Sequence, residues 1–333
     1  MKALVYLGKE NMVYRDVDEP QAEPGTVLVK VKACGICGSD MHGYHGHDPR
    51  RIPPMIMGHE IAGVVETGPM AGQRVTVNPL LTCGACTACV SGAPQLCEMQ
   101  RNIGLPPHAG GFAERIVVPE RNVVKIPDDM DFRVAALTEP IAVAYHAVRL
   151  GAASLRRPLS AARVAVLGGG AIGLASALVA IAQGAGTVML AEPNPIRRQT
   201  ASAASHAIIA YDPNNPSSTP PANSIDLIFD AVGAKQTREA AFQMANRGAT
   251  IVHLGLLPGS EEVDVRRITL AEIAFIGSYC YSMADFRETV ALLASGRLGP
   301  LNWVESRDLS EGHQAFQDID RGNTAAAKIV LTV

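Results

Sequence analysis

Four cysteines occur in one short segment, with the spacing C-x2-C-x2-C-x7-C: Cys83, Cys86, Cys89 and Cys97. Thiols this close either form disulfides or converge on one metal ion. Zinc suits such a set, because it binds four soft ligands tetrahedrally and needs no redox partner. Four sulfur ligands leave no coordination position open, so we expect this zinc to hold a loop in shape and to perform no chemistry.

Cys37, His59, Glu60 and Glu139 form a second, incomplete set of candidate ligands. A catalytic zinc needs three protein ligands and one position left for water or substrate. Cys37 and His59 offer a thiolate and an imidazole, and no cysteine lies between the cysteine-rich segment and Cys280. The third ligand must therefore be another residue type. Glu139 is one candidate, because a buried carboxylate needs a partner such as a cation. Glu60 either binds the ion directly or stabilises it from outside the ligand shell.

A glycine-rich turn follows the apolar residues 164–167 and has the spacing G-x-G-x-x-G. The first glycine permits a tight turn, the second lets the backbone approach a pyrophosphate, and the third allows close packing of helix on strand. The helix that follows offers unpaired N–H groups and a positive dipole end to phosphates. The predicted dinucleotide contacts in this turn are Gly168, Gly170, Ala171, Ile172 and Gly173.

Glu192 stands at the end of the next predicted strand. A carboxylate there hydrogen-bonds the adenosine ribose hydroxyls and repels a 2′-phosphate, which favours NAD over NADP. Two features leave room for the alternatives: Arg197 and Arg198 would tolerate the phosphate, and Glu192 could be a solvated residue at a helix start. The remaining predicted cofactor residues are Arg197, Val232, Leu254, Gly255, Ser278 and Tyr279.

The first 140 residues alternate short β-like segments with Gly/Pro turns, which predicts a compact, mostly antiparallel β-domain. Its clearest strands are residues 26–33, 61–66, 74–78 and 114–119, after a first strand at residues 1–8. A helix is expected over residues 134–150. From residue 163 onward, strands alternate with helices of about a dozen residues, which predicts a parallel, doubly wound sheet. Its strands are expected at residues 164–167, 187–192, 207–211, 226–230, 250–254 and 273–277. Two amphipathic helices, 284–295 and 311–320, and a closing strand, 328–332, complete the chain.

The composition of the chain limits which kinds of protein and partner are expected. The chain has 333 residues, 47% hydrophobic and 18% charged, with a formal net charge of −3. This is a globular composition, and the charge gives no reason to expect nucleic acid or an anionic membrane as partner. A small-molecule partner fits better. Seven cysteines are an odd number in a chain too long to need disulfides, which favours a reducing cytoplasm.

Two segments bear on targeting. The apolar run at residues 1–8 is too short for a signal peptide. The charge-free stretch 164–191 is long enough to span a bilayer, but glycines at 168–170 and 184–186 divide it into strand, turn, helix, turn and strand. We therefore expect no transmembrane helix.

The order of these motifs is specific. C-G-I-C-G-S-D-x-H at 34–42, G-H-E at 58–60, the four-cysteine segment, E-P at 139–140 and G-G-G-A-I-G at 168–173 resemble the zinc-dependent medium-chain dehydrogenases over nearly the whole chain. Glu139 is similar to the sorbitol-like polyol branch, whereas the simple alcohol branch carries a cysteine there. Cys280 departs from that pattern, because sorbitol-type members usually have an arginine that helps bind polyol. Sorbitol itself is therefore not the expected substrate.

The resemblance implies an α/β protein with a GroES-like β-rich catalytic domain (residues 1–143), a Rossmann cofactor domain (144–276) and a C-terminal return to the catalytic domain (277–333). It places the active site in the cleft between the domains. It also implies two zinc ions per chain, a structural one on the four cysteines and a catalytic one on Cys37, His59 and Glu139 or Glu60, with Ser39 and His42 as a proton relay. A homodimer or homotetramer, joined through the Rossmann domains, is expected.

The expected reaction moves a hydride between a secondary alcohol, diol or polyol and NAD. Zinc lowers the pKa of a bound alcohol, the resulting alkoxide expels hydride to the nicotinamide, and Ser39 passes the proton toward His42. A zinc-free NADPH reductase of the same fold and a threonine-type hydroxy amino acid dehydrogenase are the alternatives. A zinc-ribbon nucleic-acid module is disfavoured, because no Lys or Arg occurs between Arg74 and Arg101.

Other candidate residues have plainer interpretations. Cys34 is expected to be a buried strand cysteine rather than half of a redox C-x-x-C pair with Cys37. Asp40 is expected to hydrogen-bond neighbouring backbone. His45 and His47 are extra ligands or, more simply, part of a solvated loop or substrate lining. His146 is expected in packed core.

Overall fold

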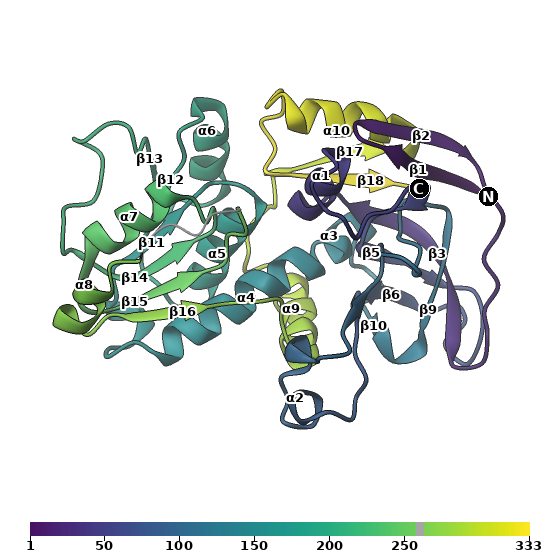
Figure 1. The fold of residues 1–333 in the computed structure, drawn as a ribbon, viewed down its shortest axis with the longest axis horizontal. Helices are drawn as coiled ribbons and strands as arrows, with labels where there is room; N and C mark the ends of the chain where they lie inside the picture. Colours follow the sequence, from purple (N-terminus) through teal and green to yellow (C-terminus); the bar gives the residue numbers. More distant parts are fainter. Residues whose placement is uncertain (258–262) are drawn as a thin grey trace. The chain divides into compact units, whose positions relative to one another are not determined.

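The computed structural model describes residues 1–257 and 263–333, which form two compact units. The β-rich unit comprises Met1–Pro140, Ser282–Ser295 and Val304–Val333, and the parallel-sheet unit comprises Ile141–Tyr281 and Gly296–Trp303. The units divide at 140/141 and 281/282, whereas the family resemblance implied divisions at 143/144 and 276/277. In addition, residues 296–303 return to the parallel-sheet unit. Figure 1 shows both units along the chain.

The β-rich unit is built on a seven-stranded sheet in the order β10-β6-β5-β3-β18-β17, with β9 also paired to β3. Neighbouring strands run antiparallel, except β17 and β18, which are parallel. The strands are β3 (Thr26–Gly35), β5 (Glu60–Val65), β6 (Arg74–Val77), β9 (Arg115–Pro119), β10 (Val123–Lys125), β17 (Val304–Asp308) and β18 (Lys328–Thr332). The closing strand β18 thus lies directly beside β3.

Smaller elements complete this unit. One three-stranded antiparallel sheet contains β1 (Lys2–Gly8), β2 (Asn11–Asp16) and β4 (Met55–Ile56), and a two-stranded sheet contains β7 (Leu80–Leu81) and β8 (Arg101–Asn102). Its helices are α1 (Gly38–Tyr44), α2 (Thr87–Val90), α3 (Phe132–Ala136), α9 (Met283–Ala294) and α10 (Gly312–Asp320), with short 3-10 turns at Pro94–Leu96, Glu120–Asn122 and Leu309–Glu311.

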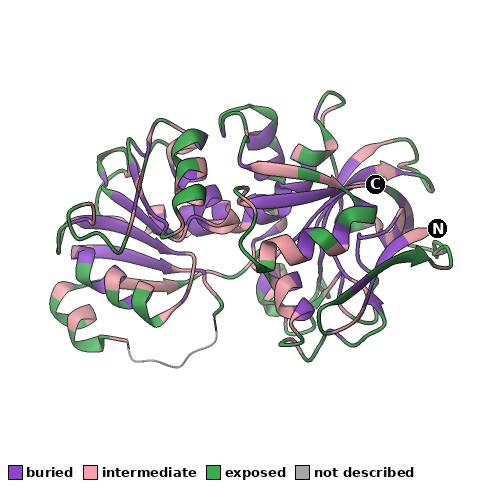
Figure 2. Cartoon of the chain, turned by 90° about the horizontal axis from the view of Figure 1, so that it is seen from above, coloured by how far each residue is buried: buried purple, intermediate pink, exposed green. Residues whose placement is uncertain are grey.

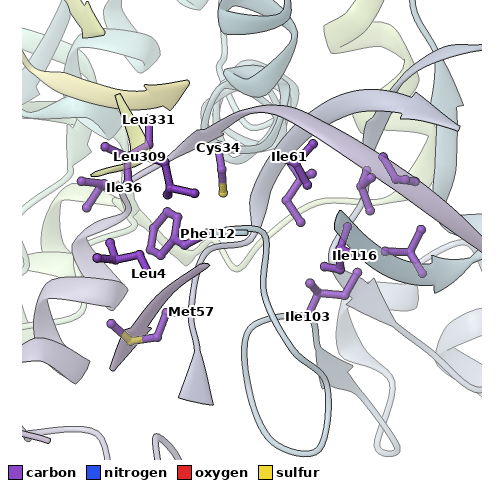
Figure 3. Close-up of a cluster of buried hydrophobic side chains, with 14 of the residues drawn as sticks. Leu4, Cys34, Ile36, Met57, Ile61, Ile103, Phe112, Ile116, Leu309 and Leu331 are labelled. Carbon is purple, nitrogen blue, oxygen red and sulfur yellow. The ribbon is translucent and has the colours of Figure 1, made fainter. Parts of the chain in front are cut away.

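The core of the β-rich unit follows from alternation along β3. Val27, Val29 and Val31 are buried, while the residues between them are half-buried or exposed. Around this face gather apolar side chains from distant segments, including Leu4, Phe112 and the others labelled in Figure 3. Cys34 belongs to this cluster and is fully buried on β3, which confirms it as a strand cysteine. The segments that carry the candidate ligands are therefore supported by a closely packed apolar core.

The parallel-sheet unit contains six parallel strands in the order β13-β12-β11-β14-β15-β16. This doubly wound order reverses between β11 and β14, and such folds bind ligands outside the carboxyl ends of the strands at that reversal. The strands are β11 (Val164–Leu167), β12 (Val188–Ala191), β13 (Ile208–Tyr211), β14 (Ile225–Asp230), β15 (Ala245–His253) and β16 (Ala274–Gly277). The helices are α5 (Ala171–Ala182), α6 (Pro195–Ala204), α7 (Lys235–Met244) and α8 (Val265–Ala271), with a 3-10 turn at Leu159–Ala161.

The central strands β11 and β14 are buried at every position, and Figure 2 shows buried residues through the middle of this sheet. Helices cover such a sheet, so its strands are apolar throughout rather than alternating. The charge-free stretch of the sequence is accordingly β11, α5 and β12. No helix in the described part of the chain combines the length and apolar character needed to cross a bilayer.

Two predicted elements differ from the structure. The helix expected over 134–150 is divided into α3 and α4 (Thr138–Ala153). Pro140 explains the break, because it has no N–H to continue the hydrogen bonds of α3, and the Thr138 hydroxyl instead donates to the Ala135 carbonyl at 2.7 Å. Strand β15 begins at Ala245 rather than at residue 250, because a register shift opposite Ile225 extends its pairing through a polar, glycine-containing segment.

Candidate active site and cofactor site

The four cysteines of the 83–97 segment, here called the cysteine lobe, converge in space. All their sulfur atoms lie within 4.8 Å of one another. The Sγ of Cys83 is 3.5 Å from that of Cys97 and 3.9 Å from that of Cys89. Tetrahedral zinc with bonds of about 2.3 Å places its sulfurs about 3.8 Å apart. The donor set and its spacing therefore fit a structural zinc ion.

Backbone N–H groups stabilise the first of these sulfurs, that of Cys83, as a thiolate. The N–H groups of Ala85 and Cys86 donate to Cys83 Sγ at 3.4 and 3.3 Å, across a turn in which Gly84 has φ +75°. These donors lower the pKa of Cys83 to about 6. A thiolate, the form that binds metal, is thereby favoured at neutral pH.

A second group of candidate ligands consists of Cys37, His59 and Glu60. Cys37 occupies the N-cap position of α1, and Glu60 opens β5 directly after His59. Pairing of β3 with β5 sets Gly35 opposite Glu60, which carries the two segments into register. The candidate ligand atoms of the three side chains all lie within 4.8 Å of one another.

Glu60 is completely buried, and its two carboxylate oxygens have different surroundings. Oε1 accepts a hydrogen bond from Lys328 Nζ at 2.6 Å, whereas Oε2 is buried without a hydrogen-bond partner among the described residues. A Cβ at Gly35 would lie 1.9 Å from Oε2, so only glycine leaves room for this carboxylate. An unpaired carboxylate oxygen beside a thiol and an imidazole is the kind of group that a bound cation satisfies. The residues present therefore fit a catalytic zinc ion.

Lys328 holds the other side of Glu60. It opens β18, on the opposite side of β3 from β5, and also donates to the Ile36 carbonyl at 2.9 Å. Burial lowers the pKa of Lys328, but the charges of Glu60, Cys37 and Glu139 and the hydrogen bond to Glu60 together outweigh burial, and the net pKa is raised. The lysine therefore stays charged and fixes one oxygen of the carboxylate.

His59 is 6% exposed, with its Nδ1 3.7 Å from Asp40 Oδ1. Burial lowers the pKa of His59, but the charges of Asp40 and Cys37 prevail and raise it to about 10. The ring therefore stands in a strongly negative environment, which also favours a metal cation.

Glu139 lies in the first turn of α4 and is 7% exposed. Its charge contributes to the raised pKa of both His59 and Lys328, so it faces the same negative cluster. It lies outside the group whose ligand atoms all approach within 4.8 Å. The structure thus places Glu60, rather than Glu139, in the closest set with Cys37 and His59.

Ser39 and His42 both lie on α1, three residues apart, a spacing that puts two side chains on one helix face. Both are half-buried. The hydroxyl of Ser39 accepts a hydrogen bond from Arg51 Nη2 at 3.1 Å. Nothing in the local sequence pattern separates this arginine from the adjacent Arg50, so residue spacing alone does not identify it.

Asp40 does more than the sequence suggested. Its Oδ2 accepts the Cys37 N–H at 3.0 Å, the expected backbone contact. Its Oδ1, however, lies 3.1 Å from Arg51 Nη1 as well as near His59, and the side chain is fully buried. The expected backbone contact of Asp40 is therefore confirmed, and tertiary contacts give its second oxygen two charged neighbours that local spacing does not show.

Three further histidines singled out in the sequence belong to neither ligand group found in the described residues. His45 contacts Asp320 at 2.7 Å and is half-buried, and His47 is exposed. His146 is 5% exposed on α4, with its Nδ1 3.0 Å from Arg149, which confirms its burial.

In the glycine turn after β11, conformation or packing explains two of the glycines but not the third. Gly168 has φ +100°, and a Cβ on Gly173 would lie 1.8 Å from the Gly168 carbonyl oxygen. Gly170, at the N-cap of α5, has φ −71°, and a Cβ there would have no atom of the described residues within 4 Å. Neither conformation nor packing requires glycine at 170. Open space at a helix N-terminus fits a pyrophosphate, with Ala171 and Ile172 in the first turn behind it.

Glu192 follows β12 and is 3% exposed. Its Oε2 accepts the Gly169 N–H at 3.1 Å, and its Oε1 accepts the Asn194 N–H at 2.8 Å. Arg197 Nη2 lies 3.4 Å from Oε1, whereas Arg198 donates to the carbonyls of Glu192 and Pro193. The carboxylate is thus fixed against the glycine turn, on the carboxyl edge of the sheet.

The remaining predicted cofactor residues follow β14, β15 and β16. The turn at Val232 is fixed by Asp230 Oδ1, which accepts the N–H groups of Val232 and Gly233 at 3.1 and 2.9 Å. Leu254 and Gly255 both donate their N–H groups to the Asp230 carbonyl. Ser278 donates its N–H to the His253 carbonyl, and its hydroxyl is buried with no hydrogen-bond partner in residues 1–257 and 263–333. Tyr279 is 47% exposed. All of them lie at the carboxyl ends of their strands.

Family models match both units. The alcohol dehydrogenase GroES-like domain matches residues 23–128, and the zinc-binding dehydrogenase model matches residues 171–295. The 2-dehydro-3-deoxy-L-galactonate 5-dehydrogenase of Pseudoalteromonas atlantica is 32% identical over 99% of this chain and 98% of its own length. The chain belongs to the zinc-dependent medium-chain dehydrogenases.

Further relatives of this medium-chain dehydrogenase narrow its branch. The L-threonine 3-dehydrogenase of Pyrococcus abyssi is 32% identical over 95% of this chain and 94% of the relative. A probable D-xylulose reductase A of Neosartorya fischeri is 29% identical, with 96% and 94% covered. A zinc-binding dehydrogenase of Sinorhizobium meliloti, solved with NADP, superposes with a TM-score of 0.88 at 31% identity, covering 100% of this chain and 99% of that one. The chain is an oxidoreductase of the polyol branch, and the cofactors of its family are zinc and a nicotinamide dinucleotide.

Proposed function

We propose that this dehydrogenase interconverts a secondary alcohol, diol or polyol and the matching ketone, with NAD as the hydride carrier. The observation that carries the proposal is the group of Cys37, His59 and Glu60, in which one buried carboxylate oxygen has no hydrogen-bond partner in the described part of the chain. A zinc ion held there would act as a Lewis acid and lower the pKa of a substrate hydroxyl.

The chain's own residues supply the remaining steps. Cys37 and His59 hold the ion, Glu60 is kept in place by Lys328, and Glu139 is the alternative carboxylate, acting directly or through a water. The substrate hydroxyl releases its proton to Ser39 Oγ while Ser39 passes its own proton toward His42. No net charge accumulates on the serine in such an exchange.

NAD is proposed over NADP because of Glu192. Its carboxylate, fixed by two backbone N–H groups, hydrogen-bonds a ribose diol and repels a 2′-phosphate. Arg198 is committed to backbone carbonyls, and Arg197 already faces this carboxylate. Glu192→Ser should raise the ratio of kcat/KM for NADP over NAD by about tenfold or more, since it removes the repulsion. A ratio that does not change would remove Glu192 from cofactor selection.

The substrate class follows from what the relatives are named for. Each of these compounds has a secondary hydroxyl next to a carbon that carries another polar group. The compounds are galactonate (at carbon 5), threonine (at carbon 3) and the alcohol formed from xylulose. Cys280, with φ 47° just before the buried Tyr281, stands where an arginine would support sorbitol. A smaller diol or a sugar acid is therefore proposed ahead of sorbitol, with a hydroxy amino acid as the second candidate.

The deciding experiment follows NADH absorbance with zinc-loaded protein and a panel of secondary alcohols, diols, sugar alcohols, sugar acids and L-threonine. Turnover with at least one secondary alcohol supports the proposal, and preference for threonine selects the second candidate. Stripping the metal with a chelator should abolish turnover. Full activity with NADPH after metal removal would instead identify a zinc-free reductase.

A homodimer or homotetramer is proposed through the edge of the parallel sheet. In the described residues β16 pairs with β15 alone, and exposed apolar side chains in this unit include Leu256 after β15 and Val265 and Leu270 on α8. Light scattering should give a mass of at least two chains, reduced by Leu270→Lys. Because thiolate ligands must stay reduced, the cytoplasm is the proposed location.

A further inference from the structure

Two adjacent arginines, Arg50 and Arg51, differ sharply in burial. The side chain of Arg50 is 68% exposed and donates to Asp48 at 2.9 and 3.0 Å. The side chain of Arg51 is 3% exposed, and its Nε lies 3.4 Å from the same Asp48. A buried guanidinium needs charged or polar partners on all sides, so the contacts of Arg51 indicate what it is for.

Each arm of the Arg51 guanidinium reaches the proposed active site. Nη1 donates to Asp40 Oδ1 at 3.1 Å, and Nη2 donates to Ser39 Oγ at 3.1 Å. A Cβ at Gly43 would lie 2.1 Å from Arg51 Cδ, so α1 carries a glycine where the arginine passes. The helix that bears Ser39 and the arginine that contacts it are therefore built around each other.

The hydrogen-bond inventory of Ser39 gives this contact a consequence. A serine hydroxyl has two acceptor lone pairs and one proton. Arg51 occupies one lone pair and cannot itself accept or release a proton at physiological pH. One acceptor and one donor remain, the number that a residue needs to receive one proton while giving up another.

We propose that Arg51 is a positioning residue that orients the Ser39 hydroxyl for proton transfer. The inference rests on the relay role of Ser39 in the proposed function. In the exchange, a bond forms between Ser39 Oγ and the substrate proton as the original O–H bond breaks toward His42, and Arg51 keeps all its protons. Its positive charge also opposes protonation of the serine beyond this exchange.

The groups around Arg51 define what else its removal would disturb. Asp40 and Asp48 face it as anions, His59 lies behind Asp40, and the charge of Arg51 acts on the pKa of Tyr6. Replacing Arg51 therefore leaves two carboxylates with less compensation. A purely structural role predicts loss of stability from this source and nothing more, which the experiment must separate from a role in proton transfer.

The test compares Arg51→Met with Arg50→Met as the matched control. Arg51→Met should lower kcat by about tenfold to a hundredfold, because a misaligned catalytic group costs this much, while KM changes less than twofold. The solvent deuterium isotope effect on kcat should increase, because proton transfer becomes slower. Arg50→Met should match the wild type in all three measurements.

Zinc affinity, measured by competition with a chelator, gives a readout independent of turnover. Removing a buried cation from beside the ligand group should leave zinc bound as tightly as in the wild type or more tightly. Weaker zinc binding with unchanged kcat per bound zinc would assign Arg51 a structural role and overturn the proposal. So would a zinc-loaded Arg51→Met with kcat within twofold of the wild type.

If Arg51→Met fails to fold, Arg51→Lys decides, because it keeps the buried charge but cannot bridge Asp40 and Ser39 with a planar fork. Zinc-loaded Arg51→Lys should still lose several-fold in kcat; wild-type kcat, or failure of this variant to fold, overturns the proposal. Ser39→Ala separates this failure from that of the proposed function: undiminished kcat in Ser39→Ala removes the relay itself, whatever Arg51 does.

Discussion

The cysteine lobe and the Cys37–His59–Glu60 group use overlapping chemistry but are assembled differently. The lobe draws four identical ligands from one short, largely solvent-accessible segment, with backbone N–H groups arranged around Cys83. The second group draws three different ligands from two segments that strand pairing joins, and two of them are buried. The lobe is accessible to solvent, but its four sulfur ligands leave no coordination position open on a zinc ion. The second group has a buried, strongly charged environment and too few ligands to close the shell, which is what catalysis requires.

Cys37→Ser tests the chemical side of this contrast and has the largest expected effect. Losing the thiolate should lower kcat by roughly a thousandfold or more, because the zinc's contribution of several kcal/mol is lost. Metal analysis should fall from two zinc ions per chain to one, with the circular dichroism spectrum unchanged. Cys34→Ala, which removes a buried cysteine three residues away, is the control and should keep both ions. Undiminished activity in Cys37→Ser would remove Cys37 from the mechanism.

Cys89→Ser tests the structural side. Breaking the four-sulfur shell should lower the melting temperature by roughly 5–10 °C, as expected for loss of a few kcal/mol in a chain of this size. Activity of the remaining folded protein should change much less than in Cys37→Ser. An unchanged melting temperature with two zinc ions still bound would contradict a structural role for the lobe.

A pair of isosteric variants sharpens the ligand assignment in the second group. Glu60→Gln should weaken zinc binding about ten- to a hundredfold, since it alters the carboxylate closest to Cys37 and His59 and its bond to Lys328. Glu139→Gln should weaken it less, because Glu139 lies outside that closest set. Chelator competition on both proteins measures the difference, and the reverse order would make Glu139 the ligand.

The smallest expected effect is a proton release when zinc binds. In protein stripped of metal, the pKa of His59 is raised from 6.5 to about 10, so the ring is protonated near neutral pH. This charge stabilises the metal-free fold fully below about pH 6.5, and that contribution is lost as pH rises through about 10. Zinc requires the neutral ring, so its binding should release a proton. Calorimetry in buffers of different ionisation enthalpy measures it, and no release near pH 7.5 would contradict the raised pKa.

Much of the fold was predictable from local pattern. The strands at 164–167 and 328–332 match the structure residue for residue, because apolar runs bounded by turn residues are local signals. The parallel, doubly wound sheet is confirmed for the same reason, as its strands and helices alternate along the chain. The break at Leu137, shortly before Pro140, and the early start of β15 were missed. In the first case a proline overrode an otherwise helical stretch, and in the second strand pairing overrode a polar segment of low β-propensity.

Residue spacing alone was enough to predict that the four cysteines converge and that a glycine turn joins a strand to a helix. In both cases all the residues lie within one short segment of the chain. Residue spacing did not suffice to choose between Glu60 and Glu139, to see that Lys328 secures Glu60, or to distinguish Arg51 from Arg50. Lys328 and Glu60 meet only because β18 and β5 lie on either side of β3, and Arg51 is buried only because Gly43 makes room for it. Contacts between segments far apart in the chain depend on the packed core, and no short stretch of residues encodes them.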